Sequence, residues 1–117
     1  MPGGRERRAQ VRHTVDSTAA IILVNGGRRF NGRIQDVSLD GCRICSDQPF
    51  LPGVYIKVET EFRLVGSTFQ LDGVVQMIRD RLVGIRFLDL GELQRKQLAE
   101  LIVEIERLQT EAQQLRS

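Results

Sequence analysis

The hydrophobic period of this chain changes at Gly91. Before this residue, short segments alternate between apolar and polar residues, which is typical of half-buried strands. After it, apolar residues recur at heptad spacing, and this pattern predicts a helix from about Glu92 to Leu115. We therefore expect an all-β domain followed by a C-terminal α-helix.

Tight turn signals separate the β-like segments. Gly26-Gly27 supplies the positive φ angles of a two-residue hairpin, and Gly66-Ser67 marks a second turn. Successive short strands joined in this way indicate an antiparallel barrel or sandwich, and closure into a barrel would remove exposed edges. The expected strands cover residues 18–25, 28–37, 42–45, 54–65, 68–79 and 82–87.

The length of 117 residues is enough for one domain and too short for two ordinary ones. We divide it into an arginine-rich arm at 1–16, expected to be flexible or extended, a β-domain at 17–91 and a helix at 92–117. No apolar run approaches the roughly 18 residues of a membrane span, and no secretory signal is visible at the N-terminus. Two cysteines make no disulfide framework. These features favour a cytoplasmic protein without membrane contact.

The net charge of +2 is too small to indicate a dedicated nucleic-acid binder. Its distribution is more informative, because Arg5, Arg7, Arg8 and Arg12 crowd the first dozen residues. Guanidinium groups bind phosphate in a bidentate manner, so the arm could attract a phosphorylated ligand. Weak nucleic-acid binding through the arm remains an alternative, and it predicts a steep salt dependence.

Two short motifs carry the candidate binding chemistry. Arg8 and Arg12 form an RxxxR spacing, while Asp36, Ser38 and Gly41 form a DxSxxG pattern at the end of an expected strand. Arginine suits the N7 and O6 acceptors of guanine as well as phosphate. A carboxylate can accept from the N1–H and N2–H edge, and a hydroxyl can donate or accept. The two motifs together thus offer complementary partners for a purine that carries phosphates.

An arginine-rich arm with RxxxR, a strand ending in DxSxxG, further strands and a terminal helix resemble the PilZ family. The segment Gly84 to Phe87 also resembles the last strand of that family. The resemblance runs from about Glu6 to the start of the helix. It implies a six-stranded antiparallel β-barrel with the arm wrapping back over one face. It also implies a receptor for the bacterial second messenger cyclic di-GMP.

The resemblance further implies roles for individual residues. Arg8 and Arg12 would bind guanine edges and phosphates, Asp36 and Ser38 would hold a guanine on its other side, and Gly41 would shape the turn. Arg7 stands directly before RxxxR, where arginine is associated with an intercalated ligand dimer. Binding would order the arm and so relay the signal to an unidentified partner protein. The alternative is a PilZ-fold interaction adaptor that binds no nucleotide.

Catalysis and metal binding have little support in the sequence. Cys42 and Cys45 spell CxxC, but there is no second such pair and His13 is the only histidine, so four ligands are hard to assemble. Residues three apart in a strand point to opposite faces, which predicts one cysteine in the core and one outside. Ser38 has no histidine near it in the sequence. We expect neither an enzyme nor a resident cofactor.

The heptad seam outlasts the region that a small barrel can cover. A helix of this length reaches roughly 35 Å at 1.5 Å per residue. The seam continues through Leu108, Ala112 and Leu115. We therefore predict a homo-oligomer that assembles through the far half of the helix, although packing of the whole stripe on the barrel is the simpler alternative.

Overall fold

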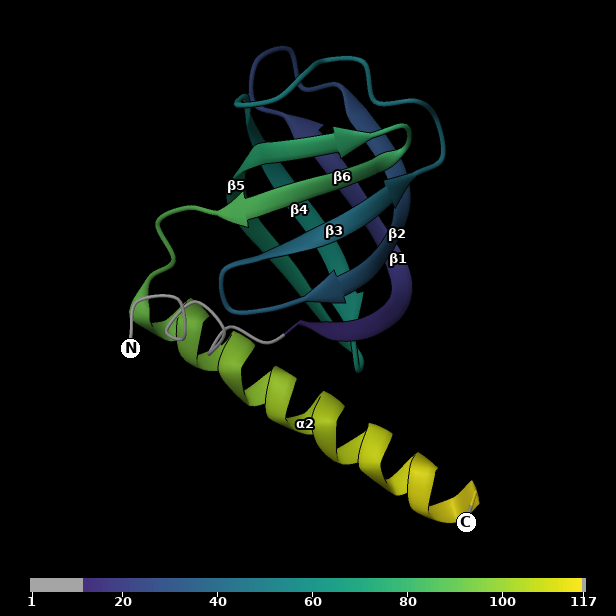
Figure 1. The fold of residues 1–117 in the computed structure, drawn as a ribbon. Coiled ribbons are helices and arrows are strands. Elements are labelled where there is room, and N and C mark those ends of the chain that lie inside the picture. The colour runs from purple at the N-terminus through teal and green to yellow at the C-terminus, as the bar shows by residue number, and fades with distance from the viewer. Residues whose placement is uncertain (1–11, 117) are drawn as a thin grey trace, which may run out of the picture.

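The computed structural model describes residues 12–116, and in it six strands close into an antiparallel barrel in the order β1-β2-β3-β6-β5-β4. A single long helix follows the last strand and lies across one end of the barrel (Figure 1). This confirms the predicted fold class. The elements are β1 (His13–Leu23), β2 (Arg29–Val37), β3 (Gly41–Ser46), β4 (Lys57–Leu64), β5 (Ser67–Arg79), β6 (Leu82–Phe87) and α2 (Glu92–Arg116).

Two strands begin three or more residues away from the position that the sequence pattern predicts. β1 begins at His13, so residues 13–16, which we assigned to the arm, belong to the barrel and pair with β2 through His13↔Val37 and Thr14↔Asp36. β4 begins at Lys57 and not at residue 54. The reason is Tyr55, whose φ of 64° is incompatible with an extended strand.

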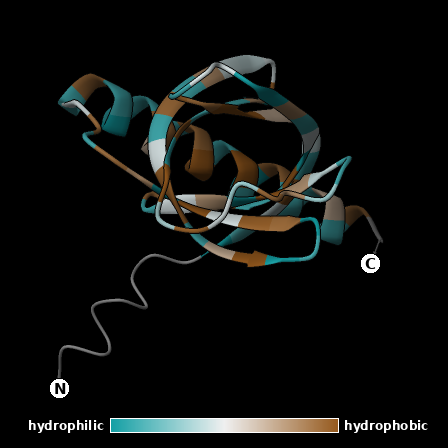
Figure 2. Cartoon of the chain, turned by 90° about the horizontal axis from the view of Figure 1, so that it is seen from above, coloured by the Kyte–Doolittle hydropathy of each residue, from teal (hydrophilic) through white to brown (hydrophobic). Residues whose placement is uncertain are grey.

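The barrel interior is filled by the inward-facing side chains of all six strands. Ile34, Ile44 and Val75 are fully buried. Phe62 stacks on Phe69 at 5.6 Å and on Phe87 at 6.3 Å between ring centroids. Figure 2 shows the strands closing into a ring, with the apolar segments of α2 passing beneath it.

Helix α2 buries its apolar side chains on the barrel as far as Ile105, and beyond this residue polar side chains contact β1. Leu98, Leu101 and Ile105 are buried against the strands, whereas Leu108 is 40% and Leu115 is 87% exposed. The far half extends past the barrel (Figure 1), as the narrowing of the apolar seam predicts. Within residues 12–116 no helix is both long and apolar enough to cross a membrane.

Candidate ligand-binding site

Asp36 lies between two guanidinium groups near the end of β2. Its Oδ1 is 3.0 Å from Nη1 of Arg12, the residue just before β1, and its Oδ2 is 3.7 Å from Nε of Arg43 on β3. The Asp36 side chain is 17% exposed, and both arginines are about two-fifths exposed (41% and 42%). A carboxylate and two arginines from three different segments therefore meet at one edge of the barrel.

A bulge turns Asp36 toward this surface. The β2–β3 register shifts between Ile34 and Asp36, and the β1–β2 register shifts between Thr14 and Ser17. In a regular strand Asp36 would share the inward face of Ile34, two residues before it. Because of the bulge, Val37 occupies the core position and Asp36 is only partly buried. The irregularity thus supplies an accessible acceptor.

Ser38 is 2% exposed, and its hydroxyl is used within the β2–β3 turn. Its Oγ accepts a hydrogen bond from the backbone N–H of Asp40 at 3.2 Å and donates to the carbonyl oxygen of Gly41 at 3.5 Å. The backbone N–H of Ser38 donates to the same carbonyl at 2.8 Å. In this conformation the hydroxyl faces the turn, so Ser38 shapes the turn whatever else it contacts.

Gly41 allows β3 to approach β6 closely. A Cβ at this position would lie 2.1 Å from the carbonyl oxygen of Ile85, a distance that no real contact permits. The backbone N–H of Phe87 donates to the carbonyl of Asp40 at 2.7 Å, which fixes the turn against β6. The absence of a side chain at Gly41 is therefore required by packing alone.

A shallow pocket of about 240 Å³ opens beside this turn. Three arginines line it, Arg12, Arg43 and Arg86, together with the carboxylate of Asp40. Such a surface favours an anionic ligand with planar groups, because guanidinium both binds phosphate and stacks on ring faces. The full lining is Arg12, Asp40, Gly41, Arg43, Gln76, Met77, Gly84, Ile85 and Arg86.

The structure brings together some of the predicted site residues and does not describe others. Arg12 and Asp36 are in contact, and Gly41 lies in the same pocket as Arg12. Arg7 and Arg8 lie outside the described residues. The sequence analysis missed Arg43, which faces Asp36 directly across the β2–β3 pair. Only knowledge of the strand register could have revealed it.

The two cysteines occupy the two faces of β3, as predicted. Cys42 is fully buried, and Cys45 is partly exposed. Burial raises the pKa of the Cys42 thiol, and the nearby charge of Asp36 adds to this effect. Among residues 12–116, no three or more histidine, cysteine or acidic side chains lie close enough to hold a metal ion.

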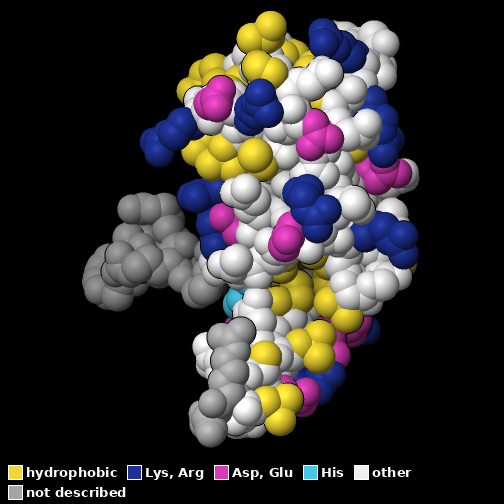
Figure 3. Space-filling view, turned by 90° about the vertical axis from the view of Figure 1, so that its right-hand side faces the viewer, with side chains coloured by type: hydrophobic (Ala, Val, Ile, Leu, Met, Phe, Trp, Pro, Cys, Tyr) yellow, Lys and Arg dark blue, Asp and Glu magenta, His cyan; other side chains and the backbone are white. Residues whose placement is uncertain are grey.

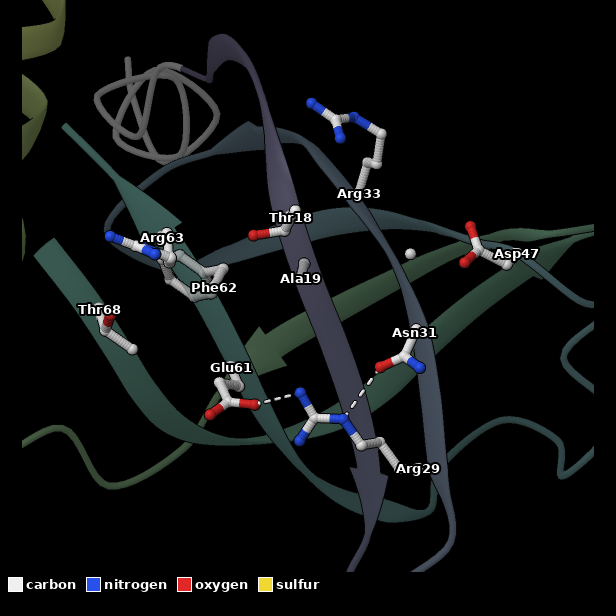
Figure 4. A pocket seen from close by; sticks show the side chains of 11 residues that line it. Thr18, Ala19, Arg29, Asn31, Arg33, Asp47, Glu61, Phe62, Arg63 and Thr68 are labelled. Atoms are coloured by element: carbon white, nitrogen blue, oxygen red, sulfur yellow. Dashed lines mark hydrogen bonds and ion pairs between the residues drawn. The ribbon is translucent and has the colours of Figure 1, made fainter. Parts of the chain in front are cut away.

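A larger hollow of about 520 Å³ lies on the outer face of β1, β2 and β4 (Figure 4). Arg29 crosses it, with Nη2 at 2.6 Å from Oε1 of Glu61 and Nε at 2.9 Å from Oδ1 of Asn31. Nearby, Arg33 pairs with Asp16 at 2.6 Å. Arg29, Arg33 and Glu61 in this hollow are already paired, whereas Asp40 and Arg86 in the pocket beside the β2–β3 turn form no ion pair with any residue of 12–116. We therefore regard the pocket beside the turn as the better candidate site.

Solved structures with the same fold are readily found. The PilZ domain of YcgR from Escherichia coli, solved with c-di-GMP, superposes with a TM-score of 0.79 at 17% identity, over 92% of this chain and 98% of that one. The PilZ domain of CeSA from a cellulose-synthesizing bacterium gives a TM-score of 0.68 at 15% identity, over 81% and 97%.

A second structure of YcgR from Escherichia coli, in complex with c-di-GMP, matches with a TM-score of 0.75 at 20% identity. The match covers 95% of this chain and 51% of YcgR, so this chain corresponds to about half of that protein. No curated protein sequence matches this chain closely.

The family model of the PilZ domain matches residues 6–104, which include both motifs and the first half of α2. The match confirms the family that the sequence resembles. PilZ domains are binding receptors, in agreement with the prediction that this chain is no enzyme. The chain therefore belongs to the PilZ domain family.

Proposed function

We propose that this protein is a receptor for cyclic di-GMP and that it binds the ligand between the RxxxR segment and the barrel. The observation that carries the proposal is the contact between Arg12 and Asp36. These residues come from two motifs, lie 24 positions apart in sequence and meet at 3.0 Å. The c-di-GMP complexes of YcgR, which has the same fold, support this choice of ligand.

The chemistry of the pocket fits a guanine dinucleotide. Arg12, Arg43 and Arg86 can bind phosphate oxygens and the N7 and O6 acceptors of guanine. Asp36 can accept from the N1–H and N2–H donors. Arg8 would add a second guanidinium, and Arg7 would favour an intercalated ligand dimer. Ser38 and Gly41 serve mainly by holding the turn that carries these groups.

Calorimetric titration of the whole protein with cyclic di-GMP tests the proposal. Loss of one charge-assisted contact costs about 1.5–3 kcal/mol, so Arg8→Ala and Arg12→Ala should each weaken binding at least about tenfold. The unfolding temperature of the unliganded protein should scarcely move, because exposed ion pairs contribute about 0–1 kcal/mol. Arg33→Ala, which removes an exposed arginine from the outer surface of β2, is the matched control.

Undiminished affinity in both variants would contradict the assignment of the arginines. A wild-type titration without heat, with the protein shown to be folded, would favour the alternative, a PilZ-fold adaptor that binds no nucleotide. Binding of single-stranded RNA in preference to cyclic di-GMP, with a steep salt dependence, would indicate a nucleic-acid binder instead.

We also propose that ligand binding orders the arm and alters the surface offered to a partner protein. The start of β1 links the pocket to α2, which supports such a relay. Nε2 of His13 lies 3.8 Å from Oε2 of Glu106, and Nε2 of Gln109 donates to the carbonyl of Thr14 at 2.7 Å. A shift of Arg12 on ligand binding would be transmitted to α2 through His13 and Thr14, the two residues that follow Arg12. Ligand-dependent hydrogen exchange across residues 101–115 would reveal the coupling, and identical exchange rates would exclude it.

The far half of α2 is proposed to mediate self-association. Its apolar seam continues past the barrel, where Leu108 is 40% and Leu115 is 87% exposed and Ala112 is exposed as well. Light scattering on a chain truncated after Glu104 tests this proposal, because the truncation removes the seam but keeps the helical turns that carry Leu98 and Leu101. An oligomer that survives the truncation would refute it.

A further inference from the structure

Large apolar side chains gather at the end of the barrel opposite α2, where Figure 3 shows hydrophobic atoms at the top of the molecule. We call this surface the apical patch. It comprises Val24 on the β1–β2 hairpin and Leu51, Val54 and Tyr55 on the loop between β3 and β4, with exposed fractions of 59%, 84%, 41% and 73%. Scattered surface leucines are ordinary, whereas a contiguous exposed group marks a candidate binding surface.

Tyr55 is held in a conformation that its side chain disfavours. Its φ of 64° lies in the left-handed region, which costs a residue with a Cβ roughly 1–2 kcal/mol. Two backbone hydrogen bonds hold it there, from Tyr55 N–H to the Val75 carbonyl at 2.7 Å and from Val75 N–H to the Ile56 carbonyl at 3.0 Å. Because Tyr55 is 73% exposed, packing offsets little of this cost. Strain without a packing gain is typical of functional positions.

Part of the patch, at Val24 and Tyr55, is concave. A hollow of about 510 Å³ lies between the hairpin and the loop, and this volume falls in the range of sites that accept a ligand or an inserted side chain. A surface that inserts into a bilayer is expected to be convex. A hollow, in contrast, can accept a side chain that projects from a peptide. The lining consists of Leu23, Val24, Asn25, Pro52, Tyr55, Ile56 and Lys57.

Two basic side chains belong to this end of the barrel, where Figure 3 also shows acidic side chains beside the hydrophobic atoms. Lys57 lines the hollow, and Arg28 belongs to the same hairpin as Val24. Neither forms an ion pair with any residue in the described part of the chain. The Arg28 guanidinium lies 4.6 Å over the ring of Phe30, which in turn contacts Phe50 at 4.8 Å. These contacts connect Arg28 of the hairpin, through Phe30, to Phe50 of the β3–β4 loop, and Lys57 and Arg28 give the patch a basic edge.

We propose that the apical patch docks a short segment of a partner protein, in which an apolar side chain enters the hollow and acidic neighbours meet Lys57 and Arg28. The patch lies where β1 ends and β2 begins, whereas Asp36 pairs with Thr14 at the other end of the same strands. Docking therefore uses a surface separate from the Arg12–Asp36 pair and from the pocket beside it, and it leaves that pocket open. The proposal does not depend on the identity of the nucleotide.

A displayed library of random short peptides, selected on the whole protein, identifies the preferred segment. The selected peptides should carry an apolar residue flanked by aspartate or glutamate. When they are titrated into isotope-labelled protein, the amide shifts should centre on Val24, Tyr55 and Lys57. Tyr55→Asn should weaken the peptides about tenfold or more, because burial of one large side chain accounts for that difference.

The same variant separates binding from folding. Asparagine tolerates the left-handed region better than tyrosine, so Tyr55→Asn should unfold at the same or a higher temperature than the wild type. Val103→Ser removes a side chain that is 62% exposed on α2 and should leave the peptide affinity unchanged. In a fresh selection, Lys57→Glu should change the preferred flanks from acidic to basic.

Three results would overturn the proposal. One is a library that yields no peptide, or only peptides whose shifts lie outside the patch. Another is equal peptide affinity in the wild type and Tyr55→Asn. The third is binding to vesicles of anionic phospholipid that Tyr55→Asn abolishes, since the patch would then be a membrane contact.

Discussion

Replacement of Gly41 by alanine tests whether the glycine of the DxSxxG motif serves packing or the ligand. Gly41 pairs with Arg86 across β3 and β6. An added Cβ would lie 2.1 Å from the Ile85 carbonyl oxygen, 3.1 Å from its carbonyl carbon and 3.2 Å from the Arg86 Cα. All three are backbone atoms, so no side-chain rotation can relieve the clash.

The cost can be estimated from these contacts. Overpacking of this kind costs about 1–3 kcal/mol. Separation of the strands would also strain the bonds from Ser38 N–H to the Gly41 carbonyl and from Phe87 N–H to the Asp40 carbonyl, at about 1 kcal/mol each. A loss of about 3–5 kcal/mol is expected, which is a large part of the roughly 5–15 kcal/mol that stabilises a domain. The unfolding temperature should fall by roughly 12 °C or more.

Urea and thermal unfolding, followed by circular dichroism, measure this loss. Gly66→Ala is the control, because Gly66 has a φ of +81° and no atom within 4 Å of an added Cβ. It should cost only about 1 kcal/mol, from backbone conformation alone. If Gly41→Ala is as mild as the control and yet abolishes cyclic di-GMP binding, the packing argument is wrong and Gly41 serves the ligand directly.

Two further predictions concern stability. Leu98→Ala should lower the free energy of unfolding by about 2–5 kcal/mol, because Leu98 is fully buried between α2 and the barrel. Val103→Ala, on the exposed face of α2, is the control and should change this free energy little. Urea titration measures both variants. The pKa of Glu61 is lowered from its usual 4.5, chiefly by the hydrogen bond from Arg29 and then by that from Gln70. The carboxylate therefore stabilises the fold above that value and loses this contribution as the pH falls below it, by a few tenths of a kcal/mol at this solvent-screened site. Glu61→Gln should remove this contribution when the free energy of unfolding is measured from roughly pH 7 to pH 3. If the variant loses as much stability in acid as the wild type, Glu61 does not make this contribution.

Short-range sequence patterns, namely turn residues and hydrophobic periodicity, predicted most of the fold. A hairpin forms around Gly26-Gly27, whose φ angles are 88° and 69°, because glycine adopts positive φ without steric cost. Its loop covers residues 24–28 and is longer than the predicted two-residue turn. The change of hydrophobic period at Gly91 located the start of α2, and the narrowing seam anticipated which part of α2 the barrel covers. Each of these features depends on residues within a few positions of one another.

Tertiary pairing determined the features that the pattern missed. Residues 13–16 contain one apolar residue, Val15, and no local signal marks them as a strand. They are extended because β2 pairs with them, through His13 and Thr14 in particular. Conversely, Val54 and Ile56 alternate as in a strand, but Tyr55 between them adopts positive φ because its N–H is bonded to β5.

The candidate site shows most clearly where sequence reasoning ends. The motifs identified Arg12 and Asp36 by type and order, but their contact depends on two register shifts, one on each side of β2. If β2 were regular, Asp36 would face the core beside Ile34, and no arginine could reach it without being buried as well. The same bulge brings Asp36 opposite Arg43, which no motif singled out. The irregularity of β2 therefore converts a strand-end aspartate into an accessible acceptor.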